Sequence, residues 1–417
     1  MRSLHYTRGV AMVLVVAAHV QSTLQALSPG TRLLDHAILV FLHGGAIGIF
    51  FCLAGFLFHH RLQQQHGKIS NGENDNVLSP TLPLRQPYPS GIFVTETPFG
   101  NEFQFWRFLK SRLCRIGVPY LAISVPVVLR RMYLEQQLKL SISTESNTFF
   151  EVLSRIATKE NLQSLLFQLC GGRDVIYAYW FIPVMLVLCL LSPFVVLFLR
   201  FTFTIQVSLV VLSILLSSLM INVPSGQAKL SVWHLFLYFW PVYLMGVMLS
   251  VHRSTILMVY LRNKGLHFSV CVIFCILCRI KILGTETTGA LREHLLKILS
   301  VCQLVFTCLF ALVVSQRFNE RQARPPQLHH IVQFLADTSF EIYLIHPWIL
   351  WKADVLMKEK NLKEPLLRMG LIVWVLETTV VLFFCASFIL VWRTIQKSLN
   401  TMKYGMIRVL HLKKSDG

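Results

Sequence analysis

The segment YTRGVAMVLVVAAHVQSTLQAL, residues 6–27, decides the fold class of this chain. As a helix it is long enough to cross the ~30 Å hydrocarbon layer of a membrane, and it carries Arg8 and His19. Eleven steps of ~100° bring an α-helix back to within about 20° of its starting direction, so these two side chains share one face. The rise between them is about 16 Å. Arg8 is therefore predicted near the membrane surface and His19 near the middle of the membrane.

A histidine in the middle of a membrane is costly unless it faces protein or water, so His19 is a candidate functional residue. Hydrogen bonding between helices would explain the same residue without any catalysis. Both interpretations stay open from this segment alone.

Apolar segments of spanning length recur along the 417 residues, of which 54% are hydrophobic and 14% charged. We therefore predict an all-α fold, a polytopic integral membrane helical bundle of about ten transmembrane helices that forms one domain over residues 1–417. The first segment is expected to be a retained helix rather than a signal peptide, because many more spans follow. The predicted spans are residues 7–27, 37–58, 116–134, 176–199, 203–221, 232–251, 266–283, 294–315, 331–351 and 368–392.

An even number of spans places both termini on one side of the membrane. The cytoplasmic side is expected, because the inner segments then hold more Lys and Arg than the outer segments. Residues 59–104 are rich in Gln, Asn, Pro, Ser and Gly and are expected to form a flexible cytoplasmic loop, with 393–417 as a basic cytoplasmic tail. Residues 135–174 are expected on the outer face, where apolar spacings of three and four predict an amphipathic helix. We expect the protein in a cell membrane, specifically the bacterial inner membrane.

Charge and motif content exclude several classes of protein. The net charge of +19 would suit nucleic acid, but many basic residues flank apolar segments, so membrane lipids are the expected partner and nucleic acid is not. Cys271, Cys275 and Cys278 share a helical face within an apolar segment and are expected to be packing residues rather than metal ligands. The chain contains no phosphate loop, dinucleotide fingerprint, HExxH or paired CxxC. Neither a metal site nor a tightly bound cofactor is expected.

A cluster of cations precedes the third predicted span, in FWRFLKSRLCRIGVPY at residues 105–120. Arg112 and Arg115 are three residues apart, so they occupy neighbouring positions of a helix at the cytoplasmic surface. Arg presents planar donors that suit phosphate, as a nucleotide diphosphate or phosphopantetheine donor would need. The ordinary basic belt of a membrane protein explains the cluster equally well.

Two further patterns allow a functional and a structural interpretation. Tyr179 and Trp180 open the fourth predicted span, where they belong either to the interfacial aromatic belt or to a platform that binds an acceptor. In the ninth predicted span Ser339, Tyr343 and His346 follow spacings of four and three, which puts them on one helical face. This polar stripe could bind substrate or form hydrogen bonds to another helix.

Together these motifs resemble, in identity, order and spacing, the type 3 membrane acyltransferase family, multi-span enzymes that O-acylate cell-surface glycans and related acceptors. The resemblance covers roughly residues 6–392. One departure is that Ala54 stands where the family's FFxxSGF has Ser, so no role of that hydroxyl is carried over; Gly55 beside it suits close approach of either a helix or a ligand. The motifs that carry the resemblance are Arg8 with His19, FFCLAGF at 50–56, the RxxR of Arg112 and Arg115, YWF at 179–181 and TSFEIYLIHP at 338–347.

The resemblance implies transfer of an acyl group, in the first place acetyl, from cytoplasmic acyl-CoA to a hydroxyl of a cell-surface carbohydrate or lipid-linked glycan. His19 would then be the base that takes the hydroxyl proton, or would form a transient acyl-His intermediate. Arg8 would bind donor phosphate or polarise the thioester carbonyl, and Arg112 and Arg115 would hold the 3'-phosphate or pyrophosphate of the donor. The residues expected to bind the acceptor are Tyr179, Trp180, Ser339, Tyr343 and His346.

A secondary transporter or flippase for an anionic or lipid-linked solute is the main alternative, since intramembrane histidines and cytoplasmic arginines suit both functions. Transporters usually contain internal repeats with broken helices in matching positions, and no convincing repeat relates the two halves of this chain. A receptor-like or scaffolding protein would leave Arg8 and His19 unexplained.

Overall fold

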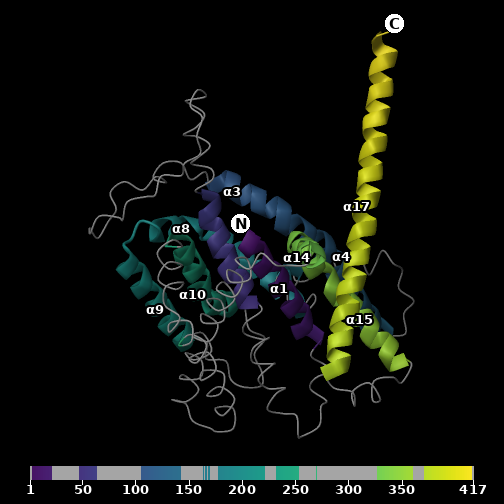
Figure 1. Cartoon of the computed structure of the whole chain (residues 1–417). Helices are drawn as coiled ribbons and strands as arrows, with labels where there is room; N and C mark the ends of the chain where they lie inside the picture. Colours follow the sequence, from purple (N-terminus) through teal and green to yellow (C-terminus); the bar gives the residue numbers. More distant parts are fainter. Residues whose placement is uncertain are drawn as a thin grey trace. The chain divides into compact units, whose positions relative to one another are not determined.

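The computed structural model describes residues 2–20, 47–62, 105–141, 163, 165–166, 168–169, 177–220, 232–252, 269, 326–359 and 371–415. Within these ranges the regular structure is helical and contains no β-strand, which confirms the all-α part of the predicted fold class (Figure 1). Three helical stretches in it are long and apolar enough to cross a membrane, and a bent helix pair raises the number to four. The three stretches are Phe105–Leu134, Trp233–Val251 and Trp374–Leu399.

The chain divides into two compact units, and each is described by itself. Unit 1 comprises Met1–Leu42 and Ser315–Gly417, so it joins the two ends of the sequence. Unit 2 comprises His43–Val314.

Unit 1 is built on α1 (Arg2–His19), which packs against α14 (Pro326–Asp337), α15 (Ser339–Glu359) and α17 (Leu371–Ser415). Gly9 allows α1 to approach α14 closely, because a Cβ at this position would lie 2.7 Å from the carbonyl oxygen of Val332. Such a small residue at a crossing point is typical of helix pairs in membranes.

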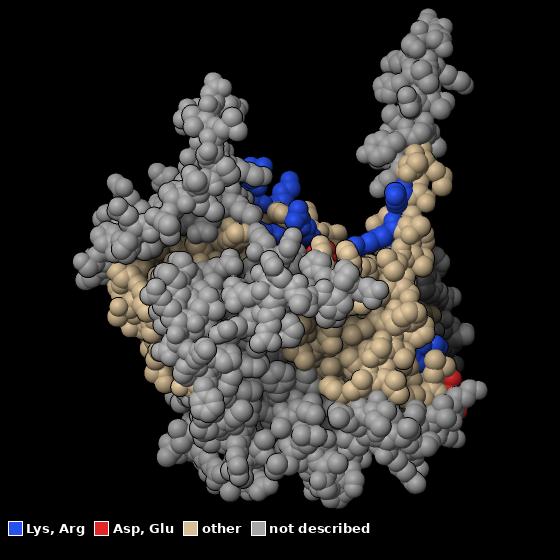
Figure 2. All heavy atoms as spheres, in the orientation of Figure 1, with Lys and Arg blue, Asp and Glu red and all other residues tan. Residues whose placement is uncertain are grey.

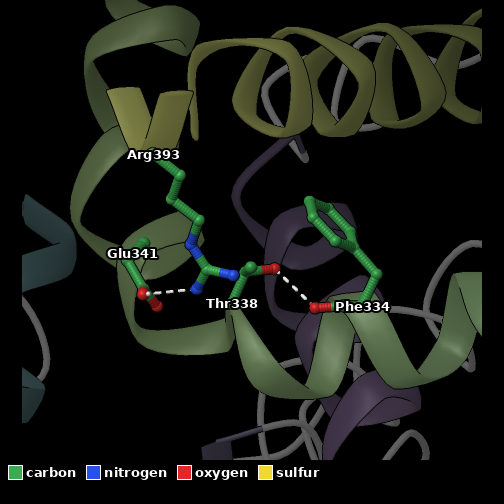
Figure 3. Close-up of polar contacts among 4 residues, drawn as sticks. All are labelled: Phe334, Thr338, Glu341 and Arg393. Atoms are coloured by element: carbon green, nitrogen blue, oxygen red, sulfur yellow. Dashed lines mark hydrogen bonds and ion pairs between the residues drawn. The ribbon is translucent and has the colours of Figure 1, made fainter. Parts of the chain in front are cut away.

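The predicted span at 331–351 is wrong in its continuity and its bounds, since α14 and α15 are separate helices that meet at Thr338. Thr338 donates both its backbone N–H and its hydroxyl to the carbonyl oxygen of Phe334, at 2.9 and 2.7 Å. A hydroxyl that bonds the carbonyl four residues earlier often bends a helix. Beside the break, Arg393 of α17 donates to Glu341 of α15 at 3.0 Å (Figure 3).

α17 runs without interruption for 45 residues, about 68 Å by helical rise, and extends well beyond the other helices of unit 1 (Figure 1). The helix includes nearly all of the tenth predicted span, 368–392, and continues beyond it. The predicted tail at 393–417 continues the same helix as far as Ser415. Local apolar content marks where a span can lie, but the backbone hydrogen bonds of the helix can continue past the span into a polar segment.

Unit 2 contains the helix Ile47–Leu62, so residues 59–62 of the predicted loop are helical. The cationic segment at 105–120 was expected ahead of the third predicted span, and it forms one continuous helical stretch with that span. α3 (Phe105–Arg112) passes through the π-helical turn η4 (Leu113–Gly117) into α4 (Val118–Ser141). The backbone N–H of Val118 donates to the carbonyl of Leu113, five residues earlier, which is the spacing of a π-helical turn. The next residue, Pro119, has no N–H to donate.

The predicted span at 176–199 is a bent pair rather than one straight helix. The short 3-10 helix η5 (Tyr177–Trp180) leads into α7 (Phe181–Leu190), and α8 (Ser192–Phe198) follows at a bend of 59°. Two further helices of unit 2 lie close to their predicted bounds. They are α9 (Phe203–Met220) and α10 (Val232–Val251).

The helix Ile47–Leu62 runs parallel to α10. A Cβ on Gly55 would collide with the carbonyl of Tyr243, and a Cβ on Gly246 with the carbonyl of Cys52. One turn further along, the buried His59 hydrogen-bonds through Nδ1 to the hydroxyl of Ser250 at 2.9 Å. Gly55 thus serves close packing of helices, which was one of the two explanations of FFCLAGF.

In the predicted outer segment at 135–174, residues 135–141 continue α4, and beyond them only a few positions are described. Residues 163, 165–166 and 168–169 are helical, and Leu165 and Leu169 pack on Val128 and Met132 of α4. Several predicted features lie outside the described residues. These are most of the loop at 59–104, nearly all of the spans at 266–283 and 294–315, and Cys271, Cys275 and Cys278.

Candidate active site

α1 carries both Arg8 and His19, and both side chains are half-buried. His19 is the last residue of α1, and its Nδ1 lies 2.8 Å from the carbonyl oxygen of Val15. A carbonyl oxygen can only accept a hydrogen bond, so Nδ1 carries the proton of the neutral ring. Nε2 is then the basic nitrogen of His19.

α15 supplies a second histidine with the same local geometry. His346 has an exposed fraction of 0%, and its Nδ1 donates to the carbonyl oxygen of Ile342 at 3.1 Å. Its Nε2 is buried and has no hydrogen-bond partner among the residues that the structure describes. A buried polar atom without a partner costs free energy, so this atom requires an explanation.

The fold of unit 1 brings the two histidines together. The ring centroids of His19 and His346 are 5.0 Å apart, with an angle of 59° between the ring planes. The ring of Tyr343 lies 5.6 Å from that of His346. The structure therefore joins the motif of the first predicted span to that of the ninth.

Ser339 belongs to the same polar stripe of α15. Its hydroxyl is buried and has no hydrogen-bond partner in the described ranges. Pro347 lies inside α15 and cannot donate the backbone bond that an N–H at this position would make to the carbonyl of Tyr343. Buried hydroxyl and imidazole groups along one face of α15 would suit a polar ligand.

Trp374 of α17 anchors the end of α1, and its role was missed from the sequence. Its indole N–H donates to the carbonyl oxygen of Ala17 at 2.9 Å, and the ring packs on the buried Ala17 and Ala18. The last carbonyls of a helix lack partners in their own helix, so this bond satisfies one of them. No motif includes Trp374, so only the packing of α17 could show it.

The predicted donor-binding residues lie in unit 2. Arg112 is half-buried, with its guanidinium 5.3 Å from the centre of the Phe108 ring. Arg115 is exposed on η4. Arg112 ends α3 and Arg115 follows in the π-helical turn, so the two arginines occupy neighbouring positions of one helical stretch. Figure 2 shows Lys and Arg side chains gathered over α3.

The two predicted acceptor-binding aromatics also lie in unit 2. Tyr179 is fully buried, so it does not belong to an interfacial belt, whereas Trp180 is half-buried. Trp180 stacks on Phe239 of α10 at 5.5 Å, and Phe239 stacks on Phe51 at 4.4 Å. The YWF and FFCLAGF motifs therefore meet in one aromatic cluster.

Comparison with known proteins gives the same result as the motifs. A family model described as an acyltransferase domain, that of the type 3 acyltransferases, matches residues 1–392. The chain belongs to the type 3 acyltransferase family. No curated protein and no solved structure matched the chain.

Membership of the type 3 acyltransferase family, together with the apolar helices, makes the protein a membrane acyltransferase. The family match spans α1, α15 and most of the apolar part of α17, so it includes both histidines. An acyl transfer to a hydroxyl needs a group that accepts the hydroxyl proton, and two imidazoles with basic Nε2 atoms are chemically suited to it.

Proposed function

We propose that this protein transfers an acyl group, most simply acetyl, from acyl-CoA to a hydroxyl of a cell-surface carbohydrate or lipid-linked glycan. Acyl-CoA is a donor substrate in this proposal, and no tightly bound cofactor or metal takes part. The protein acts as one transmembrane domain in a cell membrane, the bacterial inner membrane, with both termini in the cytoplasm.

The observation that carries the proposal is the placement of His19 beside His346 in a family of acyltransferases. The hydrogen bond from Nδ1 to Val15 orients the His19 ring and leaves Nε2 as its base. In the proposed reaction Nε2 takes the proton of the acceptor hydroxyl as its oxygen attacks the thioester. A transient acyl-His19 is the alternative course of the same transfer.

The donor would be held by arginines. Arg112 and Arg115 suit the 3'-phosphate or pyrophosphate of CoA, because guanidinium groups form bidentate bonds with phosphate. The half-buried position of Arg112 supports this role, since its charge is screened less than that of a fully exposed side chain. Arg8 would bind donor phosphate or polarise the thioester carbonyl.

The acceptor would be held by the polar stripe of α15 and by aromatic side chains. Ser339, Tyr343 and His346 offer hydroxyl and imidazole groups that match the hydroxyls of a sugar. Trp180 offers a half-buried ring face, and Tyr179 is expected to support that ring from the core of unit 2.

The directions of neighbouring helices support ten membrane crossings. α1 runs in the same direction as the chain from α14 to α15, since Gly9 lies against Val332 and His19 against His346. Two helices that cross the membrane in the same direction have an odd number of crossings between them along the chain. The helix Ile47–Leu62 and α10 are also parallel, as expected if α4, the bent pair α7–α8 and α9 each cross once. The spans predicted at 266–283 and 294–315 complete ten.

The experiment uses membrane vesicles that contain the full chain. Vesicles are given acetyl-CoA, and the release of free thiol and the masses of their glycans are measured. Acyl transfer predicts that thiol release and an added acetyl mass both depend on the protein. Neither change with acetyl-CoA, nor with other short acyl-CoA donors, would contradict the proposal.

A transporter or flippase remains the second candidate, and the bend of 59° between α7 and α8 favours it. Discontinuous helices often form the solute site of a secondary transporter. The glycan experiment separates the two functions. Transport predicts unchanged glycan masses together with protein-dependent movement of a lipid-linked glycan across the vesicle membrane.

A further inference from the structure

Two buried side-chain atoms in the described part of unit 1 have no hydrogen-bond partner, the hydroxyl of Ser339 and Nε2 of His346, and the second is the basic one. The other ring nitrogen of His346 is accounted for, since Nδ1–H bonds the carbonyl of Ile342. His19 has the same arrangement with the carbonyl of Val15. Both rings are therefore fixed in the tautomer whose Nε2 carries a lone pair.

The distance between the rings suits one shared proton. Two imidazoles joined by an N–H···N hydrogen bond have centroids about 5 Å apart, because each nitrogen lies about 1 Å from its ring centre and the bond spans about 3 Å. The observed separation of the centroids is 5.0 Å, which permits such a bond, although Nε2 of His346 makes none with the residues that this structure describes. Two lone pairs cannot bond each other, but one added proton can join them. A second proton would be repelled by the first.

We propose that His19 and His346 form a proton-holding pair, in which His346 shares the proton that His19 removes from the acceptor hydroxyl. This inference rests on the proposed acyl transfer and adds a second proton acceptor to it. His346 acts through His19, so it is a positioning and proton-sharing residue.

The step balances without a further reactant. The acceptor oxygen forms a bond to the thioester carbonyl carbon while its proton passes to Nε2 of His19. The proton is then shared with Nε2 of His346 while the carbon–sulfur bond breaks and its electron pair leaves on sulfur. The proton finally moves to the thiolate, which yields the free thiol of CoA and leaves both imidazoles neutral.

The break at Thr338 and the anchor at Trp374 suit this pairing. α15 begins at Ser339, directly after the turn residue Thr338, and the Trp374 indole holds the last turn of α1 against α17. Both histidines thus come from helix segments whose positions are set by specific contacts. Catalysis by proton transfer requires such fixed distances.

The test compares two variants of His346 in acetyl-CoA-fed membrane vesicles that contain the full chain. His346→Asn keeps a donor that can reach the Ile342 carbonyl but has no basic nitrogen. We expect normal abundance, a fall in kcat of at least about 100-fold and a KM for acetyl-CoA within about threefold of the wild type. Thr378→Val is the matched control, because it also removes a buried bond to a carbonyl four residues earlier, and it should keep its activity.

Chemical rescue separates proton sharing from packing. His346→Ala leaves a cavity that can admit a small ring, and added imidazole should raise its kcat at least about tenfold. Pyrrole has the same size and no basic nitrogen, so it should not. Equal rescue by pyrrole, or His346→Asn within threefold of the wild type, would overturn the proton-holding pair while acyl transfer stands. Wild-type vesicles without any acyl transfer would overturn the proposed function and this inference together.

Discussion

The indole N–H of Trp374 donates a hydrogen bond of 2.9 Å to the carbonyl oxygen of Ala17, two residues before His19. The two residues are 357 positions apart in the sequence. The bond ties the end of α1, where the candidate base lies, to α17.

Trp374→Phe should keep the packing on Ala17 and Ala18 and lose the hydrogen bond. We expect a loss of about 0.5–1.5 kcal/mol in stability, measured as a lower midpoint of thermal unfolding in detergent. Trp392→Phe on the same helix is the control, because Trp392 is 51% exposed and should change the midpoint little. Equal midpoints for both variants would show that the indole bond contributes nothing.

Gly55→Ala and Gly246→Ala should destabilise unit 2, since each new Cβ would meet a carbonyl of the opposite helix. Overpacking of this kind costs about 1–3 kcal/mol, and we expect reduced abundance in membranes and a lower unfolding midpoint. Gly117→Ala is the control, because its Cβ would meet only the side chain of Leu113 at 3.6 Å. A Gly55→Ala protein as stable as Gly117→Ala would contradict the close packing of these helices.

His19→Asn should lower acyl transfer at least about 100-fold, because Asn has no nitrogen that accepts a proton. Asn can still donate to the Val15 carbonyl, so abundance should stay normal. The measurement is thiol release from acetyl-CoA in vesicles. His330→Asn, an exposed histidine of α14, should retain activity. A His19→Asn protein within tenfold of the wild type would rule out His19 as the base.

Arg112→Ala should raise KM for acyl-CoA more than it lowers kcat, as expected when binding to the ground state is lost. Arg112→Lys should recover the loss only in part, because Lys lacks the bidentate fork. Arg130→Ala provides the control on the same helical stretch, about 27 Å away by helical rise. Donor saturation curves identical to those of the wild type in both Arg112 variants would assign this residue to membrane anchoring.

The orientation of α15 and α17 can be tested with single cysteines in a protein that lacks its ten native cysteines. If both termini are cytoplasmic, a cysteine replacing the exposed Lys397 should react with an impermeant thiol reagent only from the inside. A cysteine replacing the exposed Glu359, at the end of α15, should react only from the outside. The reverse pattern would invert the topology and remove the cytoplasmic donor from the proposal.

The histidine pair shows which features of the candidate site could be predicted from the sequence. Arg8 with His19, and Ser339, Tyr343 and His346, were found from helical spacing alone, because residues on one helix have a fixed angular relation. The contact between His19 and His346 joins positions 327 residues apart, and no local pattern encodes such a distance. Trp374 and the bond of His59 to Ser250 depend equally on tertiary packing.

The sequence by itself determined the membrane class, the helical fold and the family, because long apolar segments and motif spacing are local properties of the chain. Only the tertiary structure decided where helices break, as at Thr338 and between α7 and α8, and which helix faces meet. A break depends on whether a hydroxyl, a proline or a neighbouring helix satisfies the freed backbone groups, and these partners come from distant parts of the chain. The same reason made His346 a neighbour of His19 rather than an isolated polar residue.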